Sequence, residues 1–212
     1  MIFQGIIFDL DGVICSTDEY HYQAWKELAD REGIPFDRSV NNRLRGVSRM
    51  ESLEILLERA KRFYSQEEKE KMAAAKNTRY QELLREMTPA DLSPEVFETL
   101  ETLRKQGLKL AIGSSSKNTK FILARLGLGD YFDAISDGTN ITRSKPDPQV
   151  FLMAADFIDM KPADCLVVED AKAGIQAAVS GGFDSAGLGE AAACGMATYA
   201  MKTFGDLKVI CR

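Results

Sequence analysis

The chain has 212 residues, a formal net charge of −5 and a pI near 5.1, with 45% hydrophobic and 28% charged residues. This composition is typical of an ordinary globular protein and excludes a disordered or low-complexity chain. The acidic balance argues against nucleic acid or an anionic membrane as a partner, although a small anionic substrate needs only a local group of positive charges. The length favours one core domain with a smaller insertion.

A short apolar run, Gly5–Phe8, opens the chain and is typical of a buried strand. Two carboxylates, Asp9 and Asp11, follow it directly. No basic segment followed by a long apolar stretch precedes them, so the sequence does not indicate an export signal. The pattern predicts a strand whose carboxyl end carries acidic side chains.

From about Ser16 to Asp91 the pattern changes to charged amphipathic helices. The expected helices span His21–Glu32, Arg49–Arg62 and Gln66–Met87. Pro89 and Pro94 restrict the backbone around them and are a predicted return hinge. We therefore expect a small helical domain over residues 16–92, inserted after the first strand.

Strands and helices alternate after this insertion. A second apolar run, Leu108–Gly113, ends before Ser114, and a third, Cys165–Val168, ends before Glu169 and Asp170. Helical spacing of apolar residues occurs between and after these runs, at Val96, Leu100, Leu103, Ile122, Leu126 and over 150–158, and Gly107 and Gly127 are expected helix stops. The alternation predicts an α/β fold in which residues 1–15 and 93–212 form a doubly wound parallel sheet. Sites in such sheets lie outside the carboxyl ends of the strands.

The cysteines give information about the compartment. Cys15, Cys165, Cys194 and Cys211 are scattered and form no C-x-x-C motif. This spacing is typical of reduced thiols rather than a disulfide or zinc framework. We expect a cytoplasmic protein that does not bind a membrane.

Four short motifs occur in the order found in the haloacid dehalogenase superfamily, which the chain resembles over essentially its whole length. They are Asp9-Leu-Asp11-Gly12, Ser114, Lys145-Pro146 and Glu169-Asp170. An Asp-x-Asp motif alone is common in surface loops, so the ordered set carries the resemblance. The resemblance implies a Rossmann-like core with a helical cap and Mg²⁺-dependent phosphoryl transfer.

The chemistry of these residue types agrees with that implication. A phosphate ester repels an anionic attacker, so a carboxylate nucleophile needs a divalent cation and a fixed lysine to neutralise charge. We expect Asp9 to be the nucleophile and Asp11 the general acid/base, lying on the same face if the strand period continues. Ser114 and Lys145 are expected to bind the transferring phosphoryl group. The expected Mg²⁺ ligands are Asp9, the Asp11 carbonyl, Glu169 and Asp170.

Within the superfamily the chain resembles the β-phosphoglucomutase branch, largely through the insertion. The matching residues include Thr17, Glu19-Tyr-His21, Ala24-Trp25, Gly46-Val47-Ser48-Arg49, Lys76-Asn77, Pro89-Ala-Asp91 and Ser116-Lys117-Asn118. By this resemblance Arg49 would hold the substrate's non-transferring phosphate together with Ser116, Lys117 and Asn118. His21, the only histidine, would help to align Asp11 when the cap closes. The same resemblance implies substrate contacts from Thr17, Gly46, Val47, Ser48, Lys76 and Ser115. It also implies a contact from Trp25, although the periodicity of the helix favours a place for Trp25 in the core of the insertion.

The implied reaction interconverts β-D-glucose 1-phosphate and glucose 6-phosphate. Phospho-Asp9 would donate to one sugar hydroxyl and recover phosphate from the other, with β-glucose 1,6-bisphosphate as the priming intermediate. Cap closure would exclude the water that competes for the phosphoryl group. The expected partner is thus a small phosphorylated sugar, with no nucleic acid and no membrane, and we expect a monomer.

Two alternatives remain open at this stage. The same core with water as the acceptor would be a sugar-phosphate phosphatase. A protein that keeps the fold but has lost turnover would act by binding alone, since a fold does not establish an activity. Two features depart from the family pattern, a serine at position 115 and Ala171-Lys172 after the acidic pair, and the stretch from Gly187 onward matches poorly.

Overall fold

The structure is a computed structural model, and it describes residues 3–44 and 47–212. The chain divides into two compact units. One comprises residues 1–16 and 88–212, and the other comprises residues 17–87.

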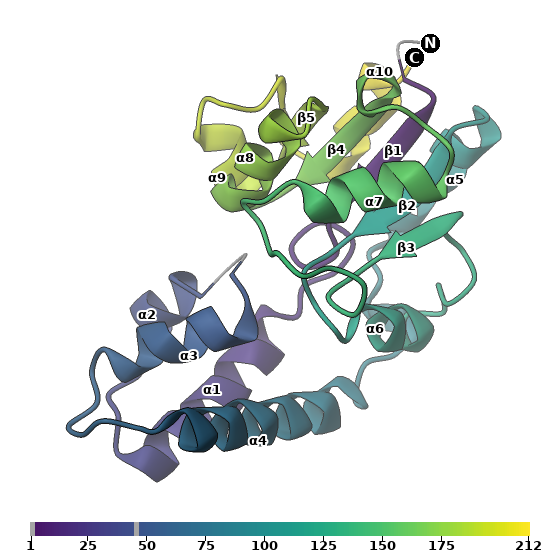
Figure 1. Ribbon diagram of the computed structural model, residues 1–212. Helices are drawn as coiled ribbons and strands as arrows, with labels where there is room; N and C mark the ends of the chain where they lie inside the picture. The colour runs from purple at the N-terminus through teal and green to yellow at the C-terminus, as the bar shows by residue number, and fades with distance from the viewer. Residues whose placement is uncertain (1–2, 45–46) are drawn as a thin grey trace. The chain divides into compact units, whose positions relative to one another are not determined.

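The larger unit is built on a parallel six-stranded sheet with the strand order β3-β2-β1-β4-β5-β6 (Figure 1). The strands are β1 (Gly5–Phe8), β2 (Lys109–Gly113), β3 (Ala134–Ser136), β4 (Cys165–Glu169), β5 (Asp184–Gly187) and β6 (Tyr199–Ala200). Strand β1 lies at the centre, with Phe8 opposite Ile112 on one side and Val168 on the other. Because β1 and β4 are covered on both faces, nearly all their residues are apolar and fully buried.

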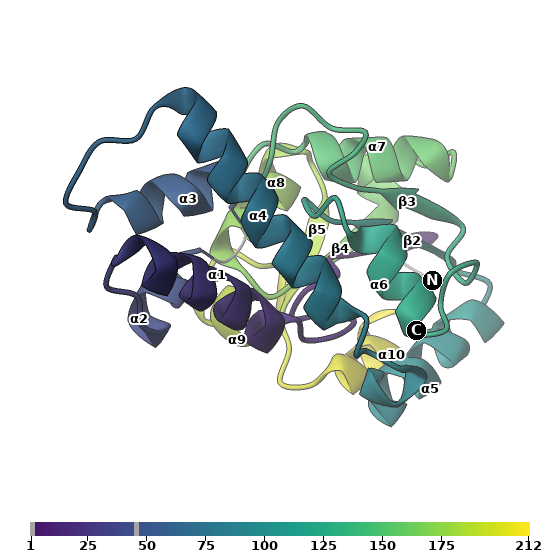
Figure 2. The same ribbon diagram turned by 90° about the horizontal axis from the view of Figure 1, so that it is seen from below.

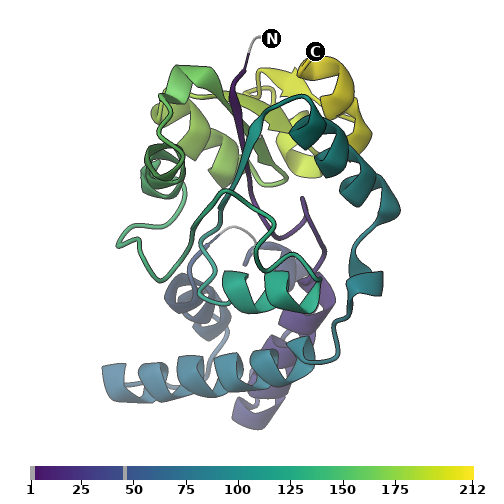
Figure 3. The same ribbon diagram turned by 90° about the vertical axis from the view of Figure 1, so that its right-hand side faces the viewer.

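Helices cover both faces of this sheet. They are α5 (Pro94–Lys105), α6 (Thr119–Arg125), α7 (Gln149–Phe157), α8 (Lys172–Ser180), α9 (Gly189–Ala193) and α10 (Leu207–Ile210), with 3₁₀ turns η1 (Pro89–Asp91), η2 (Pro162–Asp164) and η3 (Phe204–Asp206). In Figure 3 the green helices α7 and α8 lie on one side of the central strand, and α5 and the yellow α10 lie on the other. Successive side chains of β1 point to opposite faces of the sheet. Ile7 belongs to the core under α7, whereas the ring of Phe8 stacks on that of Phe204 with 5.7 Å between the ring centroids.

The predicted α/β fold with a doubly wound parallel sheet is therefore confirmed, and the three predicted strands are β1, β2 and β4. Gly107 and Gly127 follow α5 and α6 with φ of 86° and 77°, a conformation that favours glycine and ends a helix. Strands β3, β5 and β6 were not predicted. None of them contains more than two consecutive apolar residues, whereas β1 is the continuous apolar run Gly-Ile-Ile-Phe.

The smaller unit consists of four helices, α1 (Asp18–Glu32), α2 (Arg38–Asn42), α3 (Arg49–Leu57) and α4 (Gln66–Leu84). Helices α1 and α4 pack side by side (Figure 2). Ser48 and Ser65 start α3 and α4 with complete capping boxes. The buried core of this unit contains Trp25, Leu28, Ala29, Ile34, Phe36, Val40, Leu44, Leu53, Leu56, Met72 and Ala73.

The insertion is helical as expected, with small differences in its elements. Helix α2 was not predicted, because its five residues are capped by the Asp37 side chain rather than marked by a long apolar period. Helix α3 ends at Leu57 instead of Arg62. In the part of the chain that the structure describes, no helix is both long and apolar enough to cross a membrane.

Candidate active site

Three carboxylates gather at the carboxyl end of the central strands. Asp9 follows β1 and Glu169 ends β4, and these strands are neighbours, so the two side chains leave the sheet at the same edge. Each of Asp9, Glu169 and Asp170 offers an oxygen within 4.8 Å of those of the other two. Asp9 and Glu169 are buried, with 8% and 1% of their surface exposed. The sheet topology thus concentrates negative charge where water is scarce.

Lys145 compensates part of this charge. The residue as a whole is 4% exposed, and its Nζ donates hydrogen bonds to Oδ1 of Asp9 and to Oε1 of Glu169, the latter over 2.6 Å. The second oxygen of Glu169, Oε2, accepts from the amides of Asp170 and Ala171, each over 2.9 Å. Glu169 is therefore held from both sides, and its orientation is fixed before any ligand binds.

The electrostatics of the cluster follow from this burial. Burial raises the pKa of the Asp9 carboxyl well above its usual range, Lys145 opposes the rise, and the carboxylates of Glu169, Asp170 and Asp11 add to it. Burial acts to lower the pKa of Lys145, but Asp9 and Glu169 outweigh it and raise that pKa above the usual value. The lysine accordingly stays positively charged beside the acids.

Asp11 reaches this cluster by a turn rather than by strand alternation. Strand β1 ends at Phe8, so the expected continuation of the strand period to Asp11 does not occur. The chain instead turns at Gly12, whose φ is 84°, and the Gly12 amide donates to the Cys15 carbonyl over 2.7 Å. Asp11 is still close enough to raise the pKa of Asp9.

Two glycines support the acids and were not singled out as site residues from the sequence. A Cβ on Gly12 would lie 2.0 Å from Oδ2 of Asp170, and a Cβ on Gly174 would lie 1.9 Å from Oε1 of Glu169. Only glycine leaves the two carboxylates where they are. The available signal was a glycine inside the helical pattern after the acidic pair, since such a glycine usually has a packing reason.

The acidic cluster has the donor set of a Mg²⁺ site. Mg²⁺ prefers hard oxygen ligands and binds through a few carboxylates together with substrate phosphate and water. Asp9, Glu169 and Asp170 supply such oxygens, and the excess of carboxylates over the single Lys145 ammonium leaves negative charge to neutralise. The residues present therefore fit the cation.

The loop after β2 contains the predicted Ser114 and its neighbours. Ser114 is 2% exposed, and its amide donates to the Ser136 carbonyl over 3.1 Å. Within the loop the Ser116 amide donates to Ser114 Oγ and the Asn118 amide donates to Ser116 Oγ, both over 3.2 Å. Because β2 neighbours β1, this loop and Asp9 lie at the same edge of the sheet.

The remaining predicted loop residues, Ser115 and Lys117, differ in their surroundings. Ser115 Oγ is buried and has no hydrogen-bond partner among the described residues. Lys117 is exposed. The structure thus brings Ser114, Ser115, Ser116, Lys117 and Asn118 together in one compact loop.

In the helical unit, His21 and Lys76 form the centre of a second cluster. Lys76 is 3% exposed, and its Nζ lies 2.8 Å from Nδ1 of His21. The ammonium also lies 4.8 Å from the ring centroid of Trp25 and 4.5 Å from that of Tyr80. Burial lowers the pKa of His21 well below its usual value, and the charges of Lys76 and Arg49 add to this. His21 is therefore neutral at neutral pH.

The other predicted residues of this unit lie at helix starts. Thr17 is 1% exposed and its carbonyl accepts from the His21 amide over 3.0 Å. Val47 and the N-cap Ser48 precede α3, and Arg49 is its first residue. Burial lowers the pKa of the Arg49 guanidinium. Gly46 lies outside the described residues.

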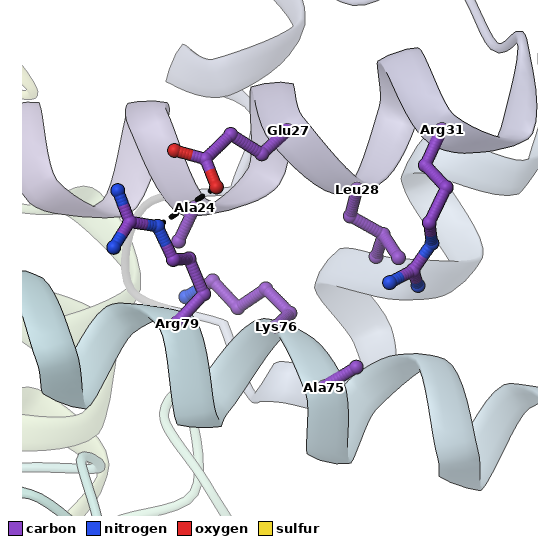
Figure 4. A pocket seen from close by; sticks show the side chains of 7 residues that line it. All are labelled: Ala24, Glu27, Leu28, Arg31, Ala75, Lys76 and Arg79. Carbon is purple, nitrogen blue, oxygen red and sulfur yellow. Dashed lines mark hydrogen bonds and ion pairs between the residues drawn. The ribbon is translucent and has the colours of Figure 1, made fainter.

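A cavity of about 270 Å³ lies between α1 and α4 of the helical unit (Figure 4). Its lining residues are Ala24, Glu27, Leu28, Arg31, Ala75, Lys76 and Arg79. Lys76 is the one predicted site residue among them, and the charge of Arg79 is paired with Glu27 over 2.8 Å. None of the predicted catalytic and metal-binding residues Asp9, Asp11, Ser114, Lys145, Glu169 and Asp170 lines this cavity.

Comparison with known proteins agrees with the class of site described above. A family model described as haloacid dehalogenase-like hydrolase matches residues 3–182. The chain belongs to this family.

The relatives include both mutases and phosphatases. A β-phosphoglucomutase of Bacillus subtilis is 46% identical over 189 residues, covering 88% of this chain and 84% of the relative. A phosphorylated carbohydrates phosphatase of Thermotoga maritima is 32% identical over 184 residues, covering 85% and 82%. The crystal structure of β-phosphoglucomutase from Clostridium difficile has a TM-score of 0.90 at 39% identity, covering 97% of this chain and 93% of that one.

Proposed function

We propose that this protein is a phosphomutase that interconverts β-D-glucose 1-phosphate and glucose 6-phosphate through phospho-Asp9. The observation that carries the proposal is the buried Lys145, which donates to both Asp9 and Glu169 at the carboxyl end of the sheet. The 46% identity to a β-phosphoglucomutase supports the substrate.

Each core residue has a separate role in the proposed reaction. Asp9 attacks phosphorus, and Lys145 balances the charge of the transferring phosphoryl group. Ser114 donates a hydrogen bond to a phosphoryl oxygen, and Asp11 moves the proton of the sugar hydroxyl. Mg²⁺, held by Asp9, Glu169, Asp170 and the Asp11 carbonyl, would neutralise the charge shared by nucleophile and phosphate.

The helical unit is proposed to be the cap. Its Arg49 would grip the non-transferring phosphate together with Ser116, Lys117 and Asn118 of the core, because a planar guanidinium donates two hydrogen bonds to phosphate oxygens. Thr17, Val47, Ser48 and Lys76 would line the cap side of the substrate site, whereas Trp25 is 2% exposed and belongs to the core of the helical unit. His21 would help to align Asp11 in the closed state. The four cysteines are free thiols, which suits the cytoplasm as the compartment.

A mutase of this kind needs two phosphate sites. One is reactive, at Asp9, and the other only holds the sugar bisphosphate while it reorients. The proposed second site combines exposed Lys117 with the amide-rich loop of Ser114 to Asn118, whose local structure is already organised by its own hydrogen bonds. β-Glucose 1,6-bisphosphate would prime the enzyme and link one turnover to the next.

The second candidate is a sugar-phosphate phosphatase with the same aspartyl-phosphate chemistry. The observation that favours it is the 32% identity to a phosphorylated carbohydrates phosphatase over 85% of this chain. In that reaction water, not a sugar hydroxyl, accepts the phosphoryl group. The two candidates differ in product, not in the core residues.

Conversion of β-glucose 1-phosphate with Mg²⁺ distinguishes them, when glucose 6-phosphate and free phosphate are followed together with and without catalytic β-glucose 1,6-bisphosphate. We expect glucose 6-phosphate to form after priming, with little free phosphate. Stoichiometric phosphate release without isomerisation would establish the phosphatase instead. An Asp9→Ala variant controls for contaminating enzymes, since it should form neither product.

A further inference from the structure

The loop after β2 is fixed by hydrogen bonds from neighbouring segments as well as by its own hydrogen bonds. The Ser116 carbonyl accepts from Thr119 Oγ1 over 2.9 Å and from the Gly138 amide over 3.1 Å. Gly138 belongs to the turn after the neighbouring strand β3, which pairs with β2 so that Gly113 lies opposite Ser136. The turn and the loop therefore lie side by side at the carboxyl edge of the sheet.

Gly138 touches the loop backbone so closely that a side chain cannot be added there. A Cβ at this position would lie 2.4 Å from the Ser115 carbonyl oxygen, 2.9 Å from the Lys117 amide nitrogen and 2.9 Å from Lys117 Cγ. Two of these atoms are backbone and cannot rotate away. Gly138 is not among the positive-φ glycines, so the contact, not its own backbone conformation, requires a glycine.

The turn that carries Gly138 is itself rigid. The Asp137 amide donates to Asn140 Oδ1 over 2.9 Å, and the Thr139 amide donates to Asp137 Oδ1 over 2.8 Å. The Asn140 amide closes the turn on the Asp137 carbonyl over 3.1 Å. Asp137 is 1% exposed, so it anchors the turn beneath the surface. Such a turn can serve as a fixed support for the loop beside it.

We propose that the Asp137–Asn140 turn, through Gly138, positions the Ser115–Asn118 loop to bind the non-transferring phosphate of the substrate. This inference rests on the proposed function and extends it to positioning residues outside the motifs. In the proposed mechanism no residue of this turn contacts the phosphoryl group that is transferred. Its disturbance should thus affect the grip on the sugar phosphate and spare the phosphorylation of Asp9.

The test compares Gly138→Ala with wild type and with Gly129→Ala in two assays. The first is mutase turnover of β-glucose 1-phosphate primed with β-glucose 1,6-bisphosphate. The second is phosphorylation of Asp9 by acetyl phosphate, in which the acetyl–phosphate P–O bond breaks, a bond to the Asp9 oxygen forms and acetate leaves. Acetyl phosphate has no second phosphate to grip. Gly129→Ala is the matched control, because beyond the adjacent residues of the chain the nearest atom to its added Cβ would be Ala124 Cα, 3.8 Å away.

We expect Gly138→Ala to raise the KM for β-glucose 1-phosphate by about 10- to 100-fold, the effect of losing a hydrogen bond or two to a charged phosphate. The acetyl phosphate rate should stay within about twofold of wild type. If Gly138→Ala folds poorly, Asn140→Ala takes its place in the test. This substitution removes the acceptor of the Asp137 amide at an exposed position, and we expect a smaller rise of the KM with the acetyl phosphate rate again unchanged.

Equal losses in both assays, or no change in either, would overturn the inference. A failure of the proposed function is separable from this, because it appears in wild type as the absence of glucose 6-phosphate before any variant is compared. A failure of the inference appears only in the variants, beside an active wild type.

Discussion

The ammonium of Lys145 donates a hydrogen bond to Oε1 of Glu169 over 2.6 Å, and the two side chains are only 2% and 1% exposed. The same ammonium also contacts Asp9. A charge taken out of water is tolerated only when it is paired and hydrogen-bonded, so these three groups depend on one another. This dependence makes the stability of the site sensitive to the loss of any one charge.

Lys145→Met should remove the only cation in direct contact with Asp9 and Glu169 among the described residues. Breaking a buried ion pair in this way costs about 3–5 kcal/mol of unfolding free energy. Loss of a charged donor to the phosphoryl group should also lower kcat by about 100- to 1,000-fold. Urea unfolding at pH 7.5 and steady-state kinetics measure the two effects.

Mg²⁺ should restore part of the stability that Lys145→Met loses, since it would bind the same carboxylates. Unfolding is therefore compared in excess Mg²⁺ and in EDTA, with Lys161→Met as the control at an exposed lysine near the amino end of β4. Two results would contradict the mutual dependence of Lys145, Asp9 and Glu169. One is a loss of unfolding free energy in Lys145→Met that is no larger than the loss in Lys161→Met, and the other is a loss that is identical in EDTA and in Mg²⁺.

Gly174→Ala should weaken Mg²⁺ binding, although alanine is the better helix former. In an exposed helix the change would stabilise the protein by about 0.5–1 kcal/mol. Here the new Cβ would lie 1.9 Å from the Glu169 carboxylate and must displace it. We expect the Mg²⁺ concentration for half-maximal activity to rise by about 10- to 100-fold. A normal Mg²⁺ titration together with a higher melting temperature would show that Glu169 does not set metal affinity.

His21 should make the stability of the helical unit depend on pH. The pKa of His21 in the folded protein is depressed below the usual 6.5. Below pH 6.5, therefore, the imidazole is protonated in the unfolded chain but stays neutral in the folded protein. The contribution of His21 to the free energy of unfolding is thus fully present above pH 6.5 and decreases as the pH falls below that value. His21→Gln lacks that loss, so the advantage of wild type in urea midpoint should shrink between pH 7.5 and pH 5.5. A difference that stays constant over this range would mean that His21 is not held neutral.

The sequence alone was sufficient for the parts of the fold that have a strong local pattern. Continuous apolar runs such as Gly5–Phe8 and helices with clear spacing were predicted within a few residues of their observed bounds. The order of four motifs also indicated which side chains gather at the sheet edge, and Asp9, Lys145 and Glu169 do lie in contact there.

What could not be predicted depends on contacts between distant segments. Strand β6 has two residues and exists because it pairs with β5. Gly138 carries no chemical group, and its role follows from a backbone approach across two neighbouring strand ends. Asp11 was expected to face the site by strand alternation, but it lies in a turn that a positive φ at Gly12 creates. Spacing along a chain does not contain such information.

The most direct test of the account is whether Asp9 carries the phosphoryl group during turnover. The enzyme is incubated briefly with β-glucose 1,6-bisphosphate labelled in both phosphates and quenched in acid, and the label bound to the protein is counted. A parallel sample is reduced with borohydride, which releases the phosphate and converts a phosphorylated aspartate to homoserine, and the position of that homoserine is located by mass spectrometry. We predict label on Asp9, none in Asp9→Asn, and transfer of the label to sugar phosphate rather than to free phosphate when β-glucose 1-phosphate is added. Label on another residue, or isomerisation by Asp9→Asn at the wild-type rate, would contradict the account.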